Sequence, residues 1–187
     1  IEQLSSRLGR ILEHSSNEIY IFDAQTLHFV QVSAGALTNL GYRMDELLDL
    51  TPIDIKPGMT REQFTTIIQP LRNGEQDMVA FETVHRRKDG SLYPVEVRLQ
   101  LSRTENPPVF VAILQDIAAR KHAEARLVYL ANYDTLTDLP NRVLLGQRLC
   151  KAIEEAEHNE RLVAVLFIDL DRFKIINDTL GHDSGDE

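Results

Sequence analysis

The chain has 187 residues, 43% of them hydrophobic and 26% charged, which is the composition of ordinary globular proteins and a length that suits one or two domains. The formal net charge of -9 excludes nucleic acid as a main partner, because binding to phosphates requires a basic face. Cys150 is the only cysteine, so an internal disulfide is excluded and a reducing compartment such as the cytoplasm is expected.

No apolar run approaches the ~18 residues that suggest a membrane-spanning helix, and no signal peptide is visible. The sequence begins at Ile1 on a pattern already in progress, and Leu4, Leu8 and Ile11 continue one stripe of an amphipathic helix. We therefore expect an N-terminal amphipathic helix over residues 1–14. We also expect both ends to be cuts through a longer protein, and a membrane anchor elsewhere in that protein stays open.

The next elements are expected in the order strand, strand, short helices and helix. The segments EIYIFD and LHFVQV surround a short turn and predict a hairpin. Residues 34–49 predict short helices interrupted at Gly41. Thr60 and the glutamine three residues later have the spacing of a capping box, which opens a helix that ends near Pro70 and Gly74.

Three further strands are expected in the same domain. The segments DMVAFETVHRR and SLYPVEVRLQLS flank Asp89 and Gly90, a dipeptide typical of tight hairpin turns, and PPVFVAILQD supplies the last strand. Apolar residues alternate along the second of these strands, where one face carries Tyr93, Val95, Val97, Leu99 and Leu101. The strand therefore covers a core on one side only. Together the elements predict an α+β domain over residues 15–117, with an antiparallel sheet and flanking helices.

A second unit is expected over residues 134–187, after a helix at residues 118–133 that contains no Gly or Pro. The segment PNRVLLGQRLCKAIEEAEHN predicts a helix with Leu145, Leu149 and Ile153 along one face. RLVAVLFIDL is a continuous apolar run and predicts a strand that is buried on both faces. A unit of this size makes a poor core by itself, so we expect it to fold only partially or against a partner.

The first domain resembles a PAS sensor domain over residues 15–118. The resemblance rests on the strand order and on the segments FVQVSAGALTNLGYRMDELL, HRRKDGSLYPVEV and VAILQDIAARKHAE. LANYDTLTDLPNR, followed by FIDLDRFKIINDTLGHDSGD, resembles the N-terminal third of a bacterial GGDEF domain, the catalytic domain of diguanylate cyclases. Asp138 stands where family members usually have glycine. The name-giving hairpin is absent, so the resemblance implies a truncated α/β domain.

This second resemblance implies roles for five residues. Diguanylate cyclases join two GTP molecules into cyclic di-GMP, and such transfers use Mg²⁺ held by carboxylate and carbonyl oxygens. The resemblance implies that Asp169 and the Leu170 carbonyl bind the metal. It implies that Lys174 contacts phosphate and that Asn177 and Asp186 hold guanine. No catalytic set is complete here, because a further acid belongs to the missing hairpin, and we expect the segment alone to be inactive.

Guanine selection has a physical basis that does not depend on the resemblance. A carboxylate accepts hydrogen bonds from N1–H and the amino group of guanine, whereas adenine presents an acceptor at N1. An unpaired buried acceptor costs roughly 1–3 kcal/mol, which is enough for useful selection against ATP.

Simpler interpretations stay open for these residues. Asp169 and Asp171 can be unliganded acids at a strand end, or Asp171 can cap the next helix. Lys174 and Asn177 can lie on a polar helix surface. The segment HRRK, residues 85–88, is interpreted as a solvated hairpin tip and not as an anion site.

For the sensor domain we expect neither haem nor flavin. It has no cysteine for a flavin adduct, residues 33–84 contain no histidine, and the chain has no tryptophan. A small-molecule pocket of unknown ligand, or no ligand, is the expectation that follows.

The expected function is that of a sensory protein whose PAS domain regulates a GGDEF domain that condenses two GTP into cyclic di-GMP. Ala123, Leu127 and Leu130 stand at coiled-coil spacing. With the resemblance, this spacing predicts a homodimer through the linker helix or the first helix. One alternative is a degenerate GGDEF module that binds GTP and controls a downstream cyclic di-GMP phosphodiesterase domain. A third is a PAS domain that serves chiefly as a dimerisation scaffold.

Overall fold

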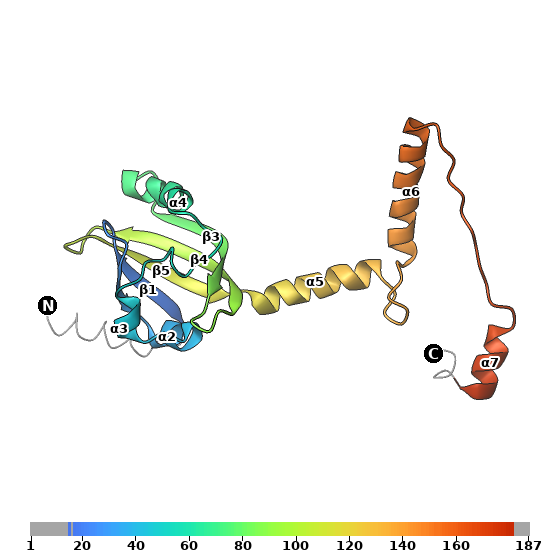
Figure 1. Cartoon of the computed structure of the whole chain (residues 1–187), viewed down its shortest axis with the longest axis horizontal. Helices are drawn as coiled ribbons and strands as arrows, with labels where there is room; N and C mark the ends of the chain where they lie inside the picture. The colour runs from blue at the N-terminus through green and yellow to red at the C-terminus, as the bar shows by residue number, and fades with distance from the viewer. Residues whose placement is uncertain (1–14, 16, 182–187) are drawn as a thin grey trace. The chain divides into compact units, whose positions relative to one another are not determined.

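The computed structural model describes residue 15 and residues 17–181 (Figure 1). The helix expected over residues 1–14 lies outside the described residues. Contacts within the chain divide it into one unit that ends at Lys121 and a second that begins at His122. We describe each unit by itself.

Five strands form one antiparallel sheet in the first unit, in the order β2-β1-β5-β4-β3 (Figure 1). Their bounds are β1 Glu18–Asp23, β2 Phe29–Val32, β3 Met78–Arg86, β4 Leu92–Ser102 and β5 Val109–Asp116. Both expected hairpins, β1–β2 and β3–β4, are confirmed. The pairing of β1 with β5 joins the two hairpins into one sheet and places Tyr20, Ala112 and Leu99 in one row across three strands.

Three helices cover the inner face of this sheet: α2 Ala34–Leu40, α3 Met44–Leu47 and α4 Arg61–Asn73. Gly41 ends α2 with φ 73°, a left-handed conformation that glycine adopts without steric cost. The capping box at Thr60 is confirmed, since its hydroxyl accepts from the Gln63 amide and the Gln63 side chain accepts from the Thr60 amide. The helix continues through Pro70, and Gly74 marks its end.

The core lies between these helices and the sheet. Tyr93, Val95, Val97 and Leu99 are buried, which confirms the predicted alternation along β4. The interpretation of HRRK as a solvated hairpin tip is wrong for its first residue. His85 belongs to β3, pairs with Tyr93 and is only 1% exposed, because the period of two places it on the core side of the strand.

The second unit is helical among its described residues. Helix α5 (Ala118–Asn132) crosses the division between the units, and α6 (Arg142–His158) and α7 (Phe173–Leu180) follow. Helices α5 and α6 agree with the prediction, and the Asn141 side chain begins α6 by accepting from the Val143 and Leu144 amides.

The strand predicted at residues 161–170 is wrong for the described structure. Those residues form neither strand nor helix, and Leu162 and Phe167 are 100% and 94% exposed. The apolar run indicates that the segment prefers burial. A strand also needs a neighbouring strand to hydrogen-bond with its backbone amides and carbonyls, and no described segment pairs with this one. No helix within the described residues is long and apolar enough to span a bilayer.

Candidate functional site

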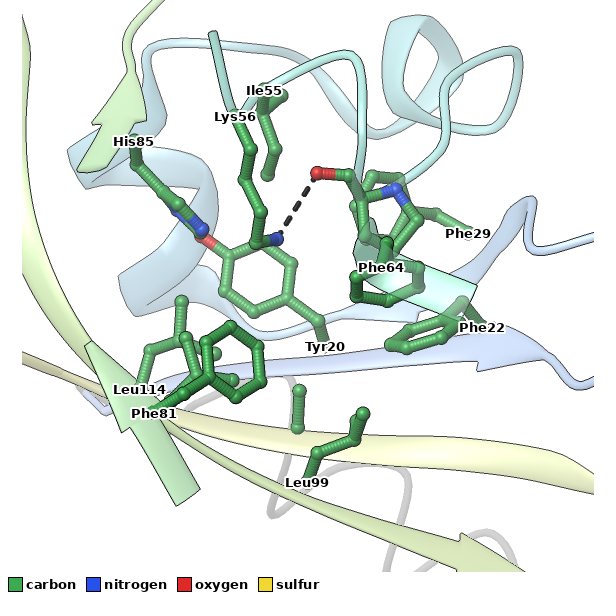
Figure 2. Close-up of a pocket in the computed structure, with 13 residues that line it drawn as sticks. Tyr20, Phe22, Phe29, Ile55, Lys56, Phe64, Phe81, His85, Leu99 and Leu114 are labelled. Atoms are coloured by element: carbon green, nitrogen blue, oxygen red, sulfur yellow. Dashed lines mark hydrogen bonds between the residues drawn. The ribbon is translucent and has the colours of Figure 1, made fainter. Parts of the chain in front are cut away.

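A small cavity lies between the inner face of the sheet and the turns that precede α4 (Figure 2). Its volume is about 10 Å³, close to the space that one water molecule needs. Most of its wall is apolar, with phenylalanine side chains from β1, β2, β3 and α4 and aliphatic side chains from β4 and β5. Lys56 and His85 are its two basic residues.

Lys56 comes from the turns after α3, in a segment without helix or strand period. Its ammonium nitrogen donates to the Pro52 carbonyl at 3.0 Å and lies 5.7 Å from the centre of the Phe64 ring. Figure 2 shows the side chain pointing into the cavity that Tyr20 also lines. Burial disfavours the charged form and lowers the pKa of Lys56 to about 7.

His85 reaches the same cavity from β3. Its Nδ1 lies 3.5 Å from the Tyr93 hydroxyl, at the outer limit of a hydrogen bond. Its Nε2 is buried and has no hydrogen-bond partner among the described residues. Burial, and next the nearby charge of Lys56, lower the pKa of His85 to about 2, so the ring is neutral at physiological pH.

The buried carboxylate of Glu18 is the centre of a hydrogen-bond network in this domain. Glu18 on β1 is 7% exposed and accepts from the hydroxyls of Tyr20 at 2.8 Å and Tyr93 at 2.9 Å. Its other oxygen accepts from the Asn39 amide group at 2.5 Å. Burial raises the pKa of both tyrosines, and the negative charge of Glu18 adds to the shift, so the phenols stay protonated donors.

Arg87 extends this network to the last strand. Its guanidinium packs over the Tyr93 ring at 4.0 Å and donates to the carbonyl and side-chain oxygens of Asn39. It also lies 4.0 Å from the carboxylate of Asp116, at the end of β5. Asp116 accepts from the Ala118 amide at 2.8 Å, at the first residue of α5. Contacts therefore run without a break from the buried Glu18 to the start of α5.

Two ion pairs fix the first turn of α5 against the sheet. Glu82 on β3 accepts from Arg120 at 2.8 Å and lies 2.7 Å from the Lys121 ammonium group. The start of the helix is thus held from two strands, by Asp116 on β5 and by Glu82 on β3.

A tight turn joins α5 to α6 within the second unit. Asp134 accepts from the amides of Leu136 and Thr137, and these hydrogen bonds, with one from the Thr137 hydroxyl, lower its pKa. Asp138 has φ 61°, the left-handed region that favours glycine, and its carboxylate accepts from the Tyr129 hydroxyl. The positive φ explains why glycine suits this position. With aspartate here, the hydrogen bond from Tyr129 offsets part of the steric cost of the left-handed backbone.

The residues assigned to metal and GTP lie before and within α7. Asp169 and Leu170 are neighbours in the exposed irregular segment, and Lys174 is exposed on the helix. Asn177 lies three residues further on the same helix face and is half-buried, with a buried Oδ1 that has no partner among the described residues. Asp186 lies outside the described residues. Within the described part of the chain, no three acidic, His or Cys side chains form a metal-binding cluster.

Comparison with known families accounts for most of the chain. Residues 17–119 match the family model described as PAS domain, and residues 131–187 match "Diguanylate cyclase, GGDEF domain". The first match covers more than half of the sequence. The chain belongs to the PAS family. The expected order, a PAS domain followed by the N-terminal part of a GGDEF domain, is confirmed.

Two curated bacterial proteins are similar to much or all of this chain. Diguanylate cyclase TpbB of Pseudomonas aeruginosa (strain UCBPP-PA14) is 44% identical over 133 residues, which are 68% of this chain and 29% of that protein. Signaling protein YkoW of Bacillus subtilis (strain 168) is 29% identical over 189 residues, with 100% of this chain and 22% of YkoW covered. The chain therefore spans less than a third of these two curated relatives.

A solved structure supports the fold of the sensor part. The PAS domain of an HTR-like protein from Haloarcula marismortui is 30% identical and has a TM-score of 0.55, over 62% of this chain and 93% of that structure. The five-stranded sheet with flanking helices is thus a PAS fold.

Sequence reasoning missed Lys56 and His85 in the PAS domain. The alternation along β3 contains a signal for His85, which lies four residues after Phe81 on the same face. Lys56 lies among irregular turns, so no periodicity marks it as buried.

Proposed function

We propose that this chain is the sensor and the beginning of the catalytic domain of a cytoplasmic cyclic di-GMP signalling protein. A PAS domain over residues 15–117 regulates, through the helix at 118–133, a GGDEF domain that begins near residue 134 and condenses two GTP molecules. The pair of family matches on one chain carries the proposal. The relative named a diguanylate cyclase, which is 44% identical over 68% of this chain, supports it.

In the proposed active site, Asp169 and the Leu170 carbonyl bind Mg²⁺. Adjacent carboxylate and carbonyl oxygens are the donors that this ion prefers, so the residues present fit it. When bound, the ion polarises phosphate oxygens and favours ionisation of the attacking 3′-hydroxyl. Lys174 places a mobile positive charge beside the phosphates, near the N-terminus of α7, where the helix dipole also favours an anion.

Asn177, with Asp186, binds the guanine base in this proposal. The buried Oδ1 of Asn177, which lacks a partner among the described residues, supports the role, because N–H donors on the base satisfy such an acceptor. Lys174 and Asn177 lie one turn apart on α7, so phosphate and base contacts share one side of a helix.

We also propose a homodimer, because the condensation needs two GTP-loaded half-sites to meet. The apolar residues of α5 support it: Leu127 and Leu130 are 67% and 44% exposed. Light scattering at high protein concentration tests the dimer, and a clean monomer mass contradicts it.

Cyclic di-GMP synthesis by a protein in which this chain continues through a whole GGDEF domain tests the proposed activity. With GTP and Mg²⁺ we expect cyclic di-GMP from the unaltered protein and none from Asp169→Ala. Asp171→Ala is the matched control, since the proposal gives that acid no metal contact. Equal synthesis by Asp169→Ala and the unaltered protein contradicts the metal role.

A second candidate is a GGDEF module that binds GTP only as an effector. Cyclic di-GMP phosphodiesterase NbdA of Pseudomonas aeruginosa is 47% identical over 66 residues, 35% of this chain and 8% of NbdA, which favours keeping this candidate. A measurement of GTP binding to the same extended protein, made beside the synthesis assay, separates the two, because GTP binding without product supports the effector role.

A further inference from the structure

Two basic side chains in the PAS core point into one apolar cavity from different elements. Figure 2 shows Lys56 entering from the turns before α4 and His85 from β3, both close to Tyr20. Lys56 is 5% exposed and His85 is 1% exposed. Basic groups at such depth normally have acidic partners, because isolated charges lose their hydration.

Neither group has an acidic partner in the described structure. The ammonium group of Lys56 has three donor hydrogens, and its described acceptor is the Pro52 carbonyl. His85 has a buried Nε2 without a partner among the described residues, and the neutral ring donates from this nitrogen in its Nε2–H tautomer, which leaves Nδ1 unprotonated at 3.5 Å from the Tyr93 hydroxyl. The nearest buried carboxylate, Glu18, already accepts from Tyr20, Tyr93 and Asn39. The site therefore offers hydrogen-bond donors to an acceptor that the wall does not supply.

We propose that this cavity binds a short-chain monocarboxylate, whose carboxylate accepts hydrogen bonds from Lys56 Nζ and His85 Nε2. Its hydrocarbon tail packs among the aromatic and aliphatic side chains of the wall, which include Phe81 and Leu99. The inference rests on the proposed sensory function, because it names the class of ligand that the PAS domain reports.

The charge of the site favours an anion over a neutral ligand. Burial lowers the pKa of both basic groups, so at pH 7 the His85 ring is neutral and Lys56 is protonated in only part of the molecules. A carboxylate restores the charged form of Lys56 and satisfies the free nitrogen of His85 at the same time. The remaining ionisable group of the wall is Tyr20, a donor already bound to Glu18. A second carboxylate on the ligand would have no described cation to meet.

The size of the cavity favours the smallest acids. A volume of about 10 Å³ holds roughly one water, so even acetate requires some outward movement of the wall. The turns at residues 51–59 supply both Lys56 and Pro52, and they contain no helix or strand. This part of the wall is held by fewer regular backbone hydrogen bonds than the sheet and is the part that we expect to move.

An NMR titration of the ¹⁵N-labelled 187-residue chain tests the proposal. Acetate, propionate and butyrate are added separately at pH 7, with acetamide and propionamide as uncharged counterparts and sodium chloride as the ionic control. We expect saturable shifts at the amides of the cavity strands, such as those of Leu99 and Ala112, with the acids alone. No saturable shift with any acid, or equal shifts with the amides, overturns the proposal.

Variants assign the binding to the two basic groups. Lys56→Met keeps the side-chain length without the charge, and we expect it to weaken binding at least ~10-fold, because a charge-assisted hydrogen bond is lost. Lys88→Met is the matched control, since Lys88 pairs with Glu46 on the surface, and its affinity is expected to stay unchanged. His85→Phe removes the ring nitrogens and keeps an aromatic side chain, and it is the deciding variant if Lys56→Met does not fold. Unchanged affinity in a folded Lys56→Met or His85→Phe chain overturns the proposal.

The titration and the cyclase assay test the two proposals separately, so one proposal can be contradicted while the other is supported. Binding of carboxylate needs neither GTP nor Mg²⁺, so saturable shifts without cyclic di-GMP synthesis by the extended protein contradict only the proposed activity. Synthesis of cyclic di-GMP without any carboxylate binding contradicts only the proposed ligand.

Discussion

At the scale of single residues, the lowered pKa of Lys56 predicts how the free energy of unfolding depends on pH. Its pKa is near 10.5 in an unfolded chain and about 7 in the folded domain. Between these values the unfolded state holds a proton that the folded state has released, so stability rises with pH. Below about pH 7 both states are protonated, and the full penalty of the buried charge remains.

We predict that Lys56→Met raises the free energy of unfolding at pH 7 by a few kcal/mol, roughly what a shift of this size implies. It also removes most of the rise in stability between about pH 7 and about pH 9.5, the window below tyrosine ionisation. Urea unfolding across this range measures both effects, with Lys88→Met as the exposed control. A rise with pH that persists in Lys56→Met shows that another group causes it.

Asp138 supports a second prediction at this scale. Its left-handed backbone costs a non-glycine residue about 1 kcal/mol, and the hydrogen bond from Tyr129 offsets part of that cost. We expect Asp138→Ala to lose the hydrogen bond and keep the strain, whereas Asp138→Gly loses both. The two variants therefore separate the backbone effect from the side-chain effect.

Amide exchange at Asp134, whose N–H donates to the Leu139 carbonyl across the turn, reports local opening. Asp138→Ala is expected to lower the free energy of opening by about 1 kcal/mol or more, and Asp138→Gly by less than about half of that. If the two variants open equally, the left-handed conformation of Asp138 carries no cost.

At the scale of elements, the sequence predicted the PAS sheet because its signals are local. Asp89 and Gly90 define a hairpin turn, alternation along β4 defines a buried face, and Thr60 with Gln63 defines the start of α4. Each of these signals depends only on residues close in the sequence. The pairing of β1 with β5 joins segments far apart in the sequence, and it was not predicted because no local pattern marks it.

The predicted strand at residues 161–170 failed for a related reason. Hydrophobicity indicates that a segment prefers burial, but burial needs a surface to cover it, and the described part of the chain provides none there. The proposed metal and GTP residues Asp169, Leu170 and Lys174 are exposed for the same reason, so their roles stay predictions.

This exposure predicts rapid amide exchange across residues 162–169. Their backbone groups have no helical or sheet partners, in contrast to β4 and β5 of the PAS sheet. Hydrogen–deuterium exchange followed by mass spectrometry is expected to label this segment in the shortest pulse, while β4 stays protected. Strong protection of residues 162–169 in a dilute monomeric sample contradicts the absence of a strand.

At the scale of the whole molecule, the central claim is that the PAS domain controls the GGDEF domain through α5. The contacts that lead to this helix are specific: Arg87 connects the buried network of Glu18 and Tyr93 to Asp116, which holds the first residue of α5. Sequence reasoning predicted the helix but not this connection, because its members are distant in the sequence and meet only in the folded domain.

The rate of cyclic di-GMP synthesis by the extended protein, measured for Asp116→Ala, tests this claim most directly. Asp45→Ala is the matched control, because Asp45 pairs with Arg43 on the exposed surface of α3. We predict that Asp116→Ala changes the rate at least ~3-fold, about the effect of losing one helix cap, while GTP affinity and the Asp45→Ala rate stay unchanged. A rate equal to that of the unaltered protein, in a folded Asp116→Ala variant, would contradict control through α5.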